Sequence, residues 1–458
     1  MSFSEKFVRT AQRILPSPFT IAILLTAITL VLALVFTEPI LDSKQSHFTQ
    51  LLLHWEGGFF NFLEFAMQMM LILVLGHALA LTRAADYLIQ SLVKYCDSTA
   101  KAAALVTFIT ILLALFNWAF ALVLGAIFAR KVGENALKNN IPLNYPLIGA
   151  AGYSGMMVWH GGLSGSAPLK VAEAGHEFEA QIGIISFNET IFSTMNLVAI
   201  LLLIVILPIA MFWLGSRVKS KPIYIKISEN KILKPINEAK LEGAERLDHA
   251  RILSFLLGSV MLFTSVYKVV FYPVLNGESF DWTFSFINPN YIIFLLFSLA
   301  ILLHGSFFKF NQAITKGVGG SIGIMTQFPF YAGIMGIMIG SGLADLVSQF
   351  FVEISTSTTF PVFTFFSAGL VNIFVPSGGG QWLVQAPILI ETSAQLQYPM
   401  SNSILALSYG DQVTNMLQPF WALPLLGVTG LKAKEILPYS LFLFLLGVLI
   451  FCTVLLLF

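Results

Sequence analysis

The sequence predicts an all-helical protein that crosses a membrane many times and is built from two related halves. Of its 458 residues, 57% are hydrophobic and only 11% are charged, and a soluble chain of this length could not bury so much apolar surface. The apolar residues gather into runs long enough for a helix to cross a bilayer, which takes about 20 residues. The second half also repeats polar residues of the first at matching distances.

Uninterrupted apolar runs predict the membrane-crossing helices, because backbone polar groups in lipid must be satisfied within the helix itself. The first run follows a basic N-terminal stretch without a cleavage pattern, so we expect an uncleaved anchor. The runs lie near residues 17–37, 58–82, 146–169, 189–214, 251–272, 285–306, 316–343, 401–430 and 435–458.

Two further apolar runs, 101–130 and 357–392, are interrupted midway by polar or glycine residues. Each predicts a re-entrant hairpin of two half-length helices. Basic residues support this topology, since cytoplasmic loops collect Lys and Arg. With a cytoplasmic N-terminus and a periplasmic or extracellular C-terminus, all but Lys44, Lys170 and Lys268 of the 25 Lys and Arg lie on the cytoplasmic side. We therefore expect a multi-pass protein of the cell inner membrane.

A polar, basic stretch at 215–250 divides the chain. We interpret it as a solvated cytoplasmic linker, with a lipid- or partner-binding role as the alternative. Residues 1–214 would form the first repeat. Residues 251–458 would form an extra span followed by the second repeat.

The repeat rests on polar residues that recur in the same order at nearly constant spacing. Because the extra span at 251–272 reverses the second half, the repeats should be inverted, as in secondary transporters. The matched residues are Gln68 and Asp86 with Gln327 and Asp345, Asn117 with Asn372, and Tyr153 and Pro168 with Tyr409 and Pro424.

Two spans, 153–169 and 409–425, contain so many Gly and Pro residues that unbroken helices are not expected. Non-helical backbone at membrane depth survives only inside protein or beside a polar cavity. The free amides at half-helix N-termini suit a carboxylate, and free carbonyls suit a cation. The broken spans therefore predict a site for an anionic substrate.

Glycines at the second hairpin tip allow successive amides to converge on an anion, and neighbouring hydroxyl and amide groups add donors. Tryptophans beside the breaks could pack against a short acyl chain. The alternatives are a purely structural turn, hydroxyls bonded to helical carbonyls, and core tryptophans. The candidate substrate-binding residues are Trp159, Ser164, Gly165, Ser166, Ser377, Gly378, Gly379, Gly380, Gln381 and Trp382.

Asp411 is the acidic residue that stands out, because carboxylates inside a membrane are costly and usually mark ion or proton pathways. A cap on the helix break is the alternative. His160 could carry a proton or be structural. Neutral oxygen donors near the breaks fit a Na+ site, substrate hydrogen bonds or polar contacts between helices; they are Asn117, Asn372, Gln412 and Asn415.

Other classes of protein are disfavoured. The net charge of +1 gives no field for nucleic acid, and Cys96 and Cys452 lack metal-ligand or disulfide spacing. Without an HExxH or GxSxG motif, no enzyme is expected. We expect no cofactor and no metal beyond a coupling H+ or Na+. The expected partners are a small organic anion, the lipid bilayer and a second copy of the chain in a homodimer.

Over essentially its whole length, and most clearly at VPSGGGQWLVQAP and YGDQVTNMLQPFWALP, the chain resembles the AtoE-type short-chain fatty acid transporters. FPFYAGI and LSGSAPL support the resemblance. It implies uptake of acids such as acetoacetate or butyrate, and a place in the ion transporter superfamily, whose dicarboxylate and citrate carriers use an elevator-like transport domain. Those carriers have Ser-Asn-Thr hairpin tips. Here the tips are Asn-Trp-Ala and Pro-Ser-Gly-Gly-Gly, so the carriers' ligands do not transfer directly.

These patterns together predict a symporter of short-chain monocarboxylates coupled to H+ or Na+. No Lys or Arg lies between Lys316 and Lys432 to hold a second carboxylate. The alternatives are a carrier of dicarboxylates or other organic anions, and a cation/proton antiporter on the same fold.

Overall fold

The computed structural model describes residues 18–39, 45–61, 63–172, 174–176, 178–220, 243–277, 286, 289–376 and 378–458, and their regular elements are all helices. The first half contains α2 (Pro18–Phe36), α3 (His47–Phe59), α4 (Leu63–Ala80), α5 (Arg83–Val93), α6 (Thr99–Phe116), α7 (Trp118–Lys138), α8 (Tyr145–Tyr153), η1 (Ser154–Met157), η2 (Trp159–Gly161), α9 (Ser166–Ala172), α10 (Glu179–Ile182) and α11 (Thr194–Arg217).

A connecting group follows, made of α12 (Glu245–His249), α13 (Arg251–Val266), the π-helical η4 (Tyr267–Phe271) and α14 (Tyr272–Leu275). The second half contains α15 (Pro289–His304), α16 (Phe307–Val318), η5 (Gly319–Ser321), α17 (Ile322–Gly340), α18 (Leu343–Glu353), α19 (Phe360–Phe374), α20 (Gly378–Leu396), α21 (Met400–Thr414), η6 (Asn415–Leu417), α22 (Pro419–Thr429) and α23 (Ala433–Leu457).

Six stretches of the described helices are long and apolar enough to cross a membrane, and α4 and α15 are shorter apolar helices. The prediction of an all-helical, multi-pass membrane protein is confirmed. The long stretches are residues 19–36, 99–116, 194–217, 251–275, 322–340 and 433–457.

The two predicted hairpins differ in detail from the expectation. Their helices are longer than half a membrane, with 18 and 21 residues in α6 and α7 and 15 and 19 in α19 and α20. At 1.5 Å per residue, α6 spans about 27 Å. Whether the chain re-enters on one side of the membrane stays a prediction.

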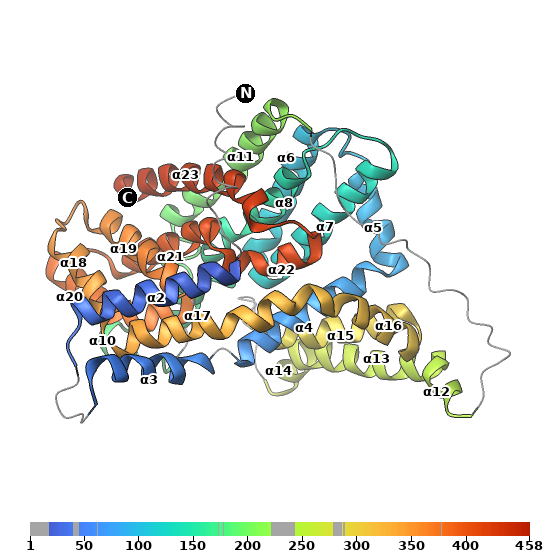
Figure 1. Ribbon diagram of the computed structural model, residues 1–458, viewed down its shortest axis with the longest axis horizontal. Helices are drawn as coiled ribbons and strands as arrows, with labels where there is room; N and C mark the ends of the chain where they lie inside the picture. Colours follow the sequence, from blue (N-terminus) through green and yellow to red (C-terminus); the bar gives the residue numbers. More distant parts are fainter. Residues whose placement is uncertain are drawn as a thin grey trace.

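The order of helices in the first half recurs in the second, and the halves exchange packing partners. Helices α2 and α3 pack against α17, whereas α15 and α16 pack against α4 (Figure 1). A two-fold relation between the halves would produce this reciprocity. The inverted orientation in the membrane and the limits of the domains stay predictions.

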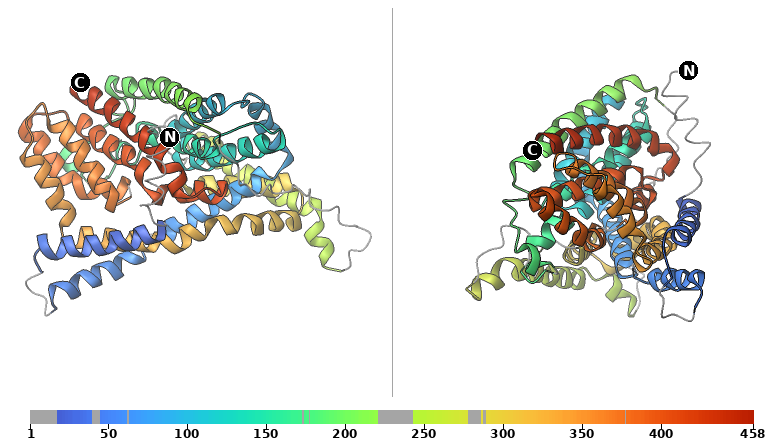
Figure 2. Two further views of the ribbon diagram at one scale, coloured as in Figure 1. Left: turned by 45° about the horizontal axis from the view of Figure 1, so that its top comes forward. Right: turned by 90° about the vertical axis from the view of Figure 1, so that its left-hand side faces the viewer.

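The helices form two layers, which are easiest to see in the left view of Figure 2. The outer layer contains α2–α4 and α13–α17. The site layer contains α6–α9, α11 and α19–α23, including both broken spans. The layers meet where α4 contacts α7 and where α17 contacts α22.

Candidate substrate and coupling site

The first interrupted run breaks at Asn117, which has extended backbone (φ −155°, ψ 127°) between α6 and α7. Its side-chain oxygen accepts a hydrogen bond from the Phe120 amide at 3.0 Å. Asn117 therefore caps the start of α7. Ser164 also stabilises the start of α7, since its hydroxyl accepts a hydrogen bond from the Trp118 amide at 3.0 Å.

The first broken span turns tightly after α8, through η1 and η2, before α9 begins. Glycine is required here, because a Cβ atom on Gly162 would lie 2.4 Å from the Leu115 carbonyl oxygen, and one on Gly165 would lie 2.1 Å from the His160 carbonyl oxygen. The chain therefore folds back on itself at His160, in the middle of the span.

The second broken span is interrupted between α21 and α22. η6 ends at Leu417, Gln418 is extended (φ −87°, ψ 125°), and Pro419 starts α22. Proline lacks an amide hydrogen and disfavours helical backbone in the residue before it, so the break follows directly from the sequence.

Asn372, in the last turn of α19, ties the second hairpin to this break. Its Nδ2 lies 2.8 Å from the Asp411 carbonyl oxygen and 2.9 Å from both Thr414 Oγ1 and Asn415 Oδ1. Gln418 donates a hydrogen bond to the Asn372 carbonyl oxygen. Three of the predicted residues, Asn372, Asp411 and Asn415, are thus neighbours.

The two broken spans meet at His160 and Asp411. His160 Nε2 lies 3.1 Å from Asp411 Oδ2, and both side chains are fully buried. The Ser166 amide donates to His160 Nδ1 at 3.3 Å, which places the proton of a neutral ring on Nε2, facing the carboxylate. Gln412 fixes the backbone by accepting a hydrogen bond from the His160 amide at 2.9 Å.

This contact has the distance of an ion pair but not the alignment of a hydrogen bond. Neither oxygen of Asp411 receives a hydrogen bond from the described residues, nor does Asn372 Oδ1. Nδ2 of Asn415 and Nε1 of Trp159 are buried there without acceptors. A buried polar group left unpaired costs about 1–3 kcal/mol, so the site has unused capacity to bind a polar ligand or a proton.

The second hairpin reaches the same point through Gly378, the first residue of α20. A Cβ atom on Gly378 would lie 2.6 Å from His160 Cε1 and 3.0 Å from Ser166 Oγ. The first turn of a helix has free amides and a partial positive charge. Gly378 therefore brings the start of α20 beside His160 and Ser166, with Gly379 and Gly380 next in the turn.

Tryptophans form the apolar side of this site. The Trp159 ring lies on the His160 ring, with centroids 3.6 Å apart. Trp118 packs against Trp159 and Trp421, at centroid distances of 5.8 and 5.2 Å. These three indoles come from the first hairpin and from both broken spans, so the cluster spans the junction of the halves.

Some candidate residues lie apart from this junction. Trp382 packs edge-on against Phe178 in a separate apolar core, with centroids 5.9 Å apart. Gln381 donates from Nε2 to the Ala368 carbonyl oxygen and to Gln385 Oε1, both at 2.8 Å. Ser377 lies outside the described residues. The polar site thus centres on Ser166, Gly378 and Asp411.

Sequence reasoning left His160 open and did not single out Trp118, Thr414 or Gln418 as site residues. The adjacency of Trp118 to Asn117, at the centre of the interrupted run, was the available signal for it. The pairing of His160 with Asp411 had no sequence signal, because the two residues lie in different halves of the chain and only folding brings them together.

An all-helical membrane protein whose two halves meet at a buried polar junction between broken helices is typical of the membrane transporters. The particular family is shown by the sequence. All of residues 1–458 match the family described as short chain fatty acid transporter, and the chain belongs to that family.

Two relatives that match along nearly their whole length carry a provisional description as short-chain fatty acid transporters. The Escherichia coli protein is 36% identical over 449 residues, covering 96% of this chain and 95% of the relative. The Haemophilus influenzae protein is 35% identical over 451 residues, covering 95% of each. The match to the solved structure of the Alcanivorax borkumensis YdaH transporter covers 96% of this chain and 98% of that chain, at 15% identity and a TM-score of 0.42.

Proposed function

We propose that this protein transports short-chain monocarboxylates, such as butyrate or acetoacetate, across the inner membrane by symport with a cation. The observation that carries the proposal is the buried contact between His160 and Asp411, where the broken spans of both halves meet beside the start of α20. Membership of the short-chain fatty acid transporter family supports the substrate class.

The substrate carboxylate would bind at the start of α20, where free helix amides converge and Ser166 adds a hydroxyl. Trp159 would offer its buried indole N–H, which has no acceptor among the described residues. Because no Lys or Arg lies between Lys316 and Lys432, a second carboxylate would find no cation within this stretch. A single carboxylate held by dipoles fits better than a dicarboxylate.

The acyl chain would lie against Trp118, Trp159 and Trp421. These rings are at least nine-tenths buried, and Trp159 lies directly on the His160 ring. Packing of indole rings against an apolar chain removes both from water. The cluster would therefore favour an acid with a short hydrocarbon tail.

The coupling ion would be a proton shared by His160 and Asp411. A buried carboxylate that receives no hydrogen bond is stabilised by protonation or by a cation at short range. His160 places Nε2 at 3.1 Å and can exchange a proton with Oδ2. Proton binding would then neutralise the pair while the substrate carboxylate enters.

A Na+ ion is the second candidate, favoured by the surroundings of Asn372. Its Nδ2 has two hydrogens but lies within 2.9 Å of three oxygen atoms, from Asp411, Thr414 and Asn415. If the side-chain amide of Asn372 were flipped by 180°, its unpaired Oδ1 would face these three oxygen atoms. Because an amide oxygen only accepts hydrogen bonds, a cation between the oxygens would then be required. Oxygen-only ligands of this kind suit an alkali cation.

Uptake of labelled butyrate into proteoliposomes, with pH and Na+ gradients imposed separately, tests the proposal. We expect an inward proton gradient to drive accumulation and a Na+ gradient alone to have no effect. Accumulation driven only by Na+ would replace the proton with the second candidate. If neither gradient drives accumulation, symport is wrong.

The two-layer arrangement supports an elevator-like motion of the site layer against the outer layer, with the N-terminus cytoplasmic and the C-terminus periplasmic. A homodimer joined through the outer layer would hold that layer still. Cross-linking of cysteine pairs placed on α4 and α7 tests the motion. If butyrate and a proton gradient leave the cross-linking rates unchanged, the layers do not slide.

A further inference from the structure

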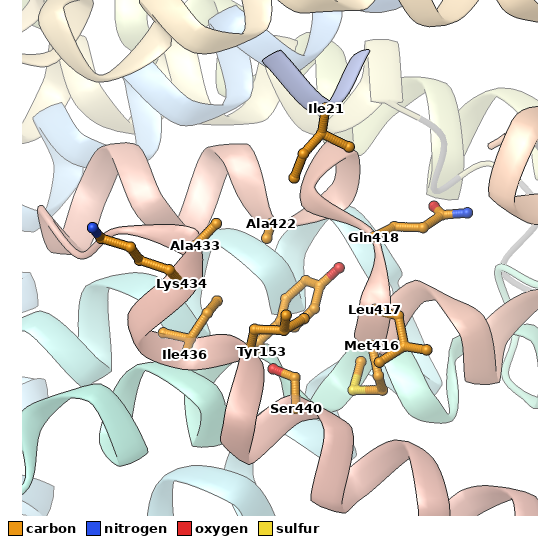
Figure 3. Close-up of a pocket in the computed structure, with 11 residues that line it drawn as sticks. Ile21, Tyr153, Met416, Leu417, Gln418, Ala422, Ala433, Lys434, Ile436 and Ser440 are labelled. Carbon is orange, nitrogen blue, oxygen red and sulfur yellow. The ribbon is translucent and has the colours of Figure 1, made fainter. Parts of the chain in front are cut away.

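A small pocket lies at the boundary between the two layers, apart from the junction of His160 and Asp411. Ile21 of α2 closes it from the outer layer, and Tyr153, Met416 and Ser440 line it from the site layer (Figure 3). Its volume is about 40 Å³. Since one water needs roughly 10–15 Å³ on this measure, the pocket has room for roughly three waters, or for an acid of a few carbons.

The lining of the pocket is mostly apolar, and the polar groups of Ser440 and Lys434 have no partner among the described residues. The Ser440 hydroxyl is buried, with 1% of the residue exposed, and makes no hydrogen bond within the described structure. Lys434 lies at the rim, partly exposed, and no ion pair joins it to a described residue. Figure 3 shows its ammonium group pointing away from Tyr153, towards the outside of the pocket.

One wall of the pocket is also a wall of the coupling site. Tyr153 borders the pocket, and its hydroxyl donates to the Asn415 carbonyl oxygen at 2.7 Å. Gln418 borders it too, and donates to the carbonyl oxygen of Asn372. Tyr153 and Gln418 therefore connect the pocket to the polar junction.

We propose that this pocket is a second binding site for the short-chain monocarboxylate, on the path between the central site and the aqueous side next to Lys434. The inference rests on the proposed function. The acyl chain would occupy the space between Ile21 and Met416, and the Ser440 hydroxyl would donate to the carboxylate. The Lys434 side chain, at the rim, would turn inward to bring its ammonium to the same carboxylate. A lone ammonium and an apolar lining select a molecule with one negative end and a short hydrocarbon tail.

Protection of a cysteine from a thiol reagent tests the site. Ser440→Cys is made in a protein in which Cys96 and Cys452 are replaced by Ser, and its modification by a small, water-soluble methanethiosulfonate is followed with increasing butyrate. We expect butyrate to slow the modification. Adding Lys434→Gln should raise the half-protecting concentration by about tenfold or more, the loss of one charge-assisted hydrogen bond, whereas Lys434→Arg should leave it nearly unchanged.

The control is Ser216→Cys, an exposed position in the last turn of α11 that does not line the pocket. Butyrate should not protect it. If Ser440→Cys is never modified, the pocket is closed to small solutes and the inference is wrong. Protection that ignores the charge at position 434 also overturns it. If the wild-type protein takes up butyrate but butyrate does not protect Ser440→Cys, the second site is wrong and the proposed function stands. If the wild-type protein takes up no butyrate and there is no protection, the proposed function is wrong as well.

Discussion

At the scale of single residues, the buried carboxylate of Asp411 gives the sharpest test of coupling. It is 1% exposed and no described residue donates a hydrogen bond to it. Asp411→Asn keeps the size of the side chain and removes its proton exchange. We expect accumulation of butyrate against a gradient to be lost, measured as uptake into proteoliposomes under an imposed proton gradient.

Exchange of internal for external butyrate without a gradient serves as the control for Asp411→Asn. Exchange needs substrate binding but no net movement of the coupling ion, so it should survive in the variant. Retention of gradient-driven accumulation would remove Asp411 from coupling.

The tryptophan cluster makes a second prediction at this scale. Trp421→Phe replaces an indole of the cluster by a smaller aromatic ring and leaves more space for the acyl chain. The preferred acid should therefore be longer by a carbon or two. One buried methylene is worth about 0.8 kcal/mol, or roughly fourfold in affinity. Competition of labelled butyrate uptake by a series of unlabelled acids measures the shift. Trp382→Phe, in the separate core, is the matched control and should leave the series unchanged.

Cys96 provides a pH-dependent prediction outside the membrane-spanning helices. It lies between α5 and α6, and burial raises the pKa of its thiol to about 12. Because a raised pKa keeps the thiol protonated, the reactive thiolate is scarce at neutral pH and forms only as the pH approaches 12. In a Cys452→Ser protein, maleimide labelling at pH 8 should be roughly a thousandfold slower than for an exposed cysteine. Labelling at the exposed rate would contradict the burial.

Single residues also show where the sequence was informative. Asp411 stood out because an acid in an apolar span is rare, and the structure places it, buried, beside His160. His160 did not stand out, because the role of a single histidine depends on the side chains that surround it in the folded protein. Its partners, Asp411 and Gln412, come from the other half of the chain. Asn117 had an equally suggestive pattern, yet its side-chain oxygen caps α7.

At the scale of elements, the start of α20 offers a matched pair of substitutions. Gly378→Ala would place Cβ 2.6 Å from His160 Cε1, whereas Gly379→Ala would meet no atom within 4 Å. We expect Gly378→Ala to displace His160 and lower butyrate uptake at least tenfold, and Gly379→Ala to stay near the wild-type rate. Uptake per molecule of protein in proteoliposomes is the measurement. Equal rates for the two variants would show that the close approach does not matter for transport.

The breaks in the helices were predictable because glycine and proline act locally. Pro419 removes an amide and Gly162 permits a contact that a side chain would block. The lengths of the hairpin helices were not predictable in the same way. Asn117 ends α6 and starts α7, but the distance that each helix extends beyond it depends on packing against α8 and α11. The amphipathic helices α3, α5, α16 and α18 were missed because an apolar count overlooks short helices with one polar face.

At the scale of the whole molecule, two repeat-related tyrosines link the halves. Tyr153 donates to the Asn415 carbonyl oxygen at 2.7 Å, and Tyr409 donates to Asn196 Oδ1 at 2.9 Å. Each therefore holds a part of the opposite half. Tyr153→Phe and Tyr409→Phe should each lower the free energy of unfolding by about 0.5–1.5 kcal/mol, measured by denaturation in detergent. Tyr87→Phe, at a position that is 78% exposed, should change nothing; an equal loss there would contradict the link.

The exchange of helices between the halves has a consequence for biogenesis. Synthesis runs from the N-terminus, so α2, α3 and α4 leave the ribosome before their partners α17, α15 and α16 exist. Until those partners are made, lipid or the insertion machinery must cover the contact faces of the early helices. These contacts can form only after residue 340 has been translated, and a product truncated before α15 would lack the partners of its own first helices.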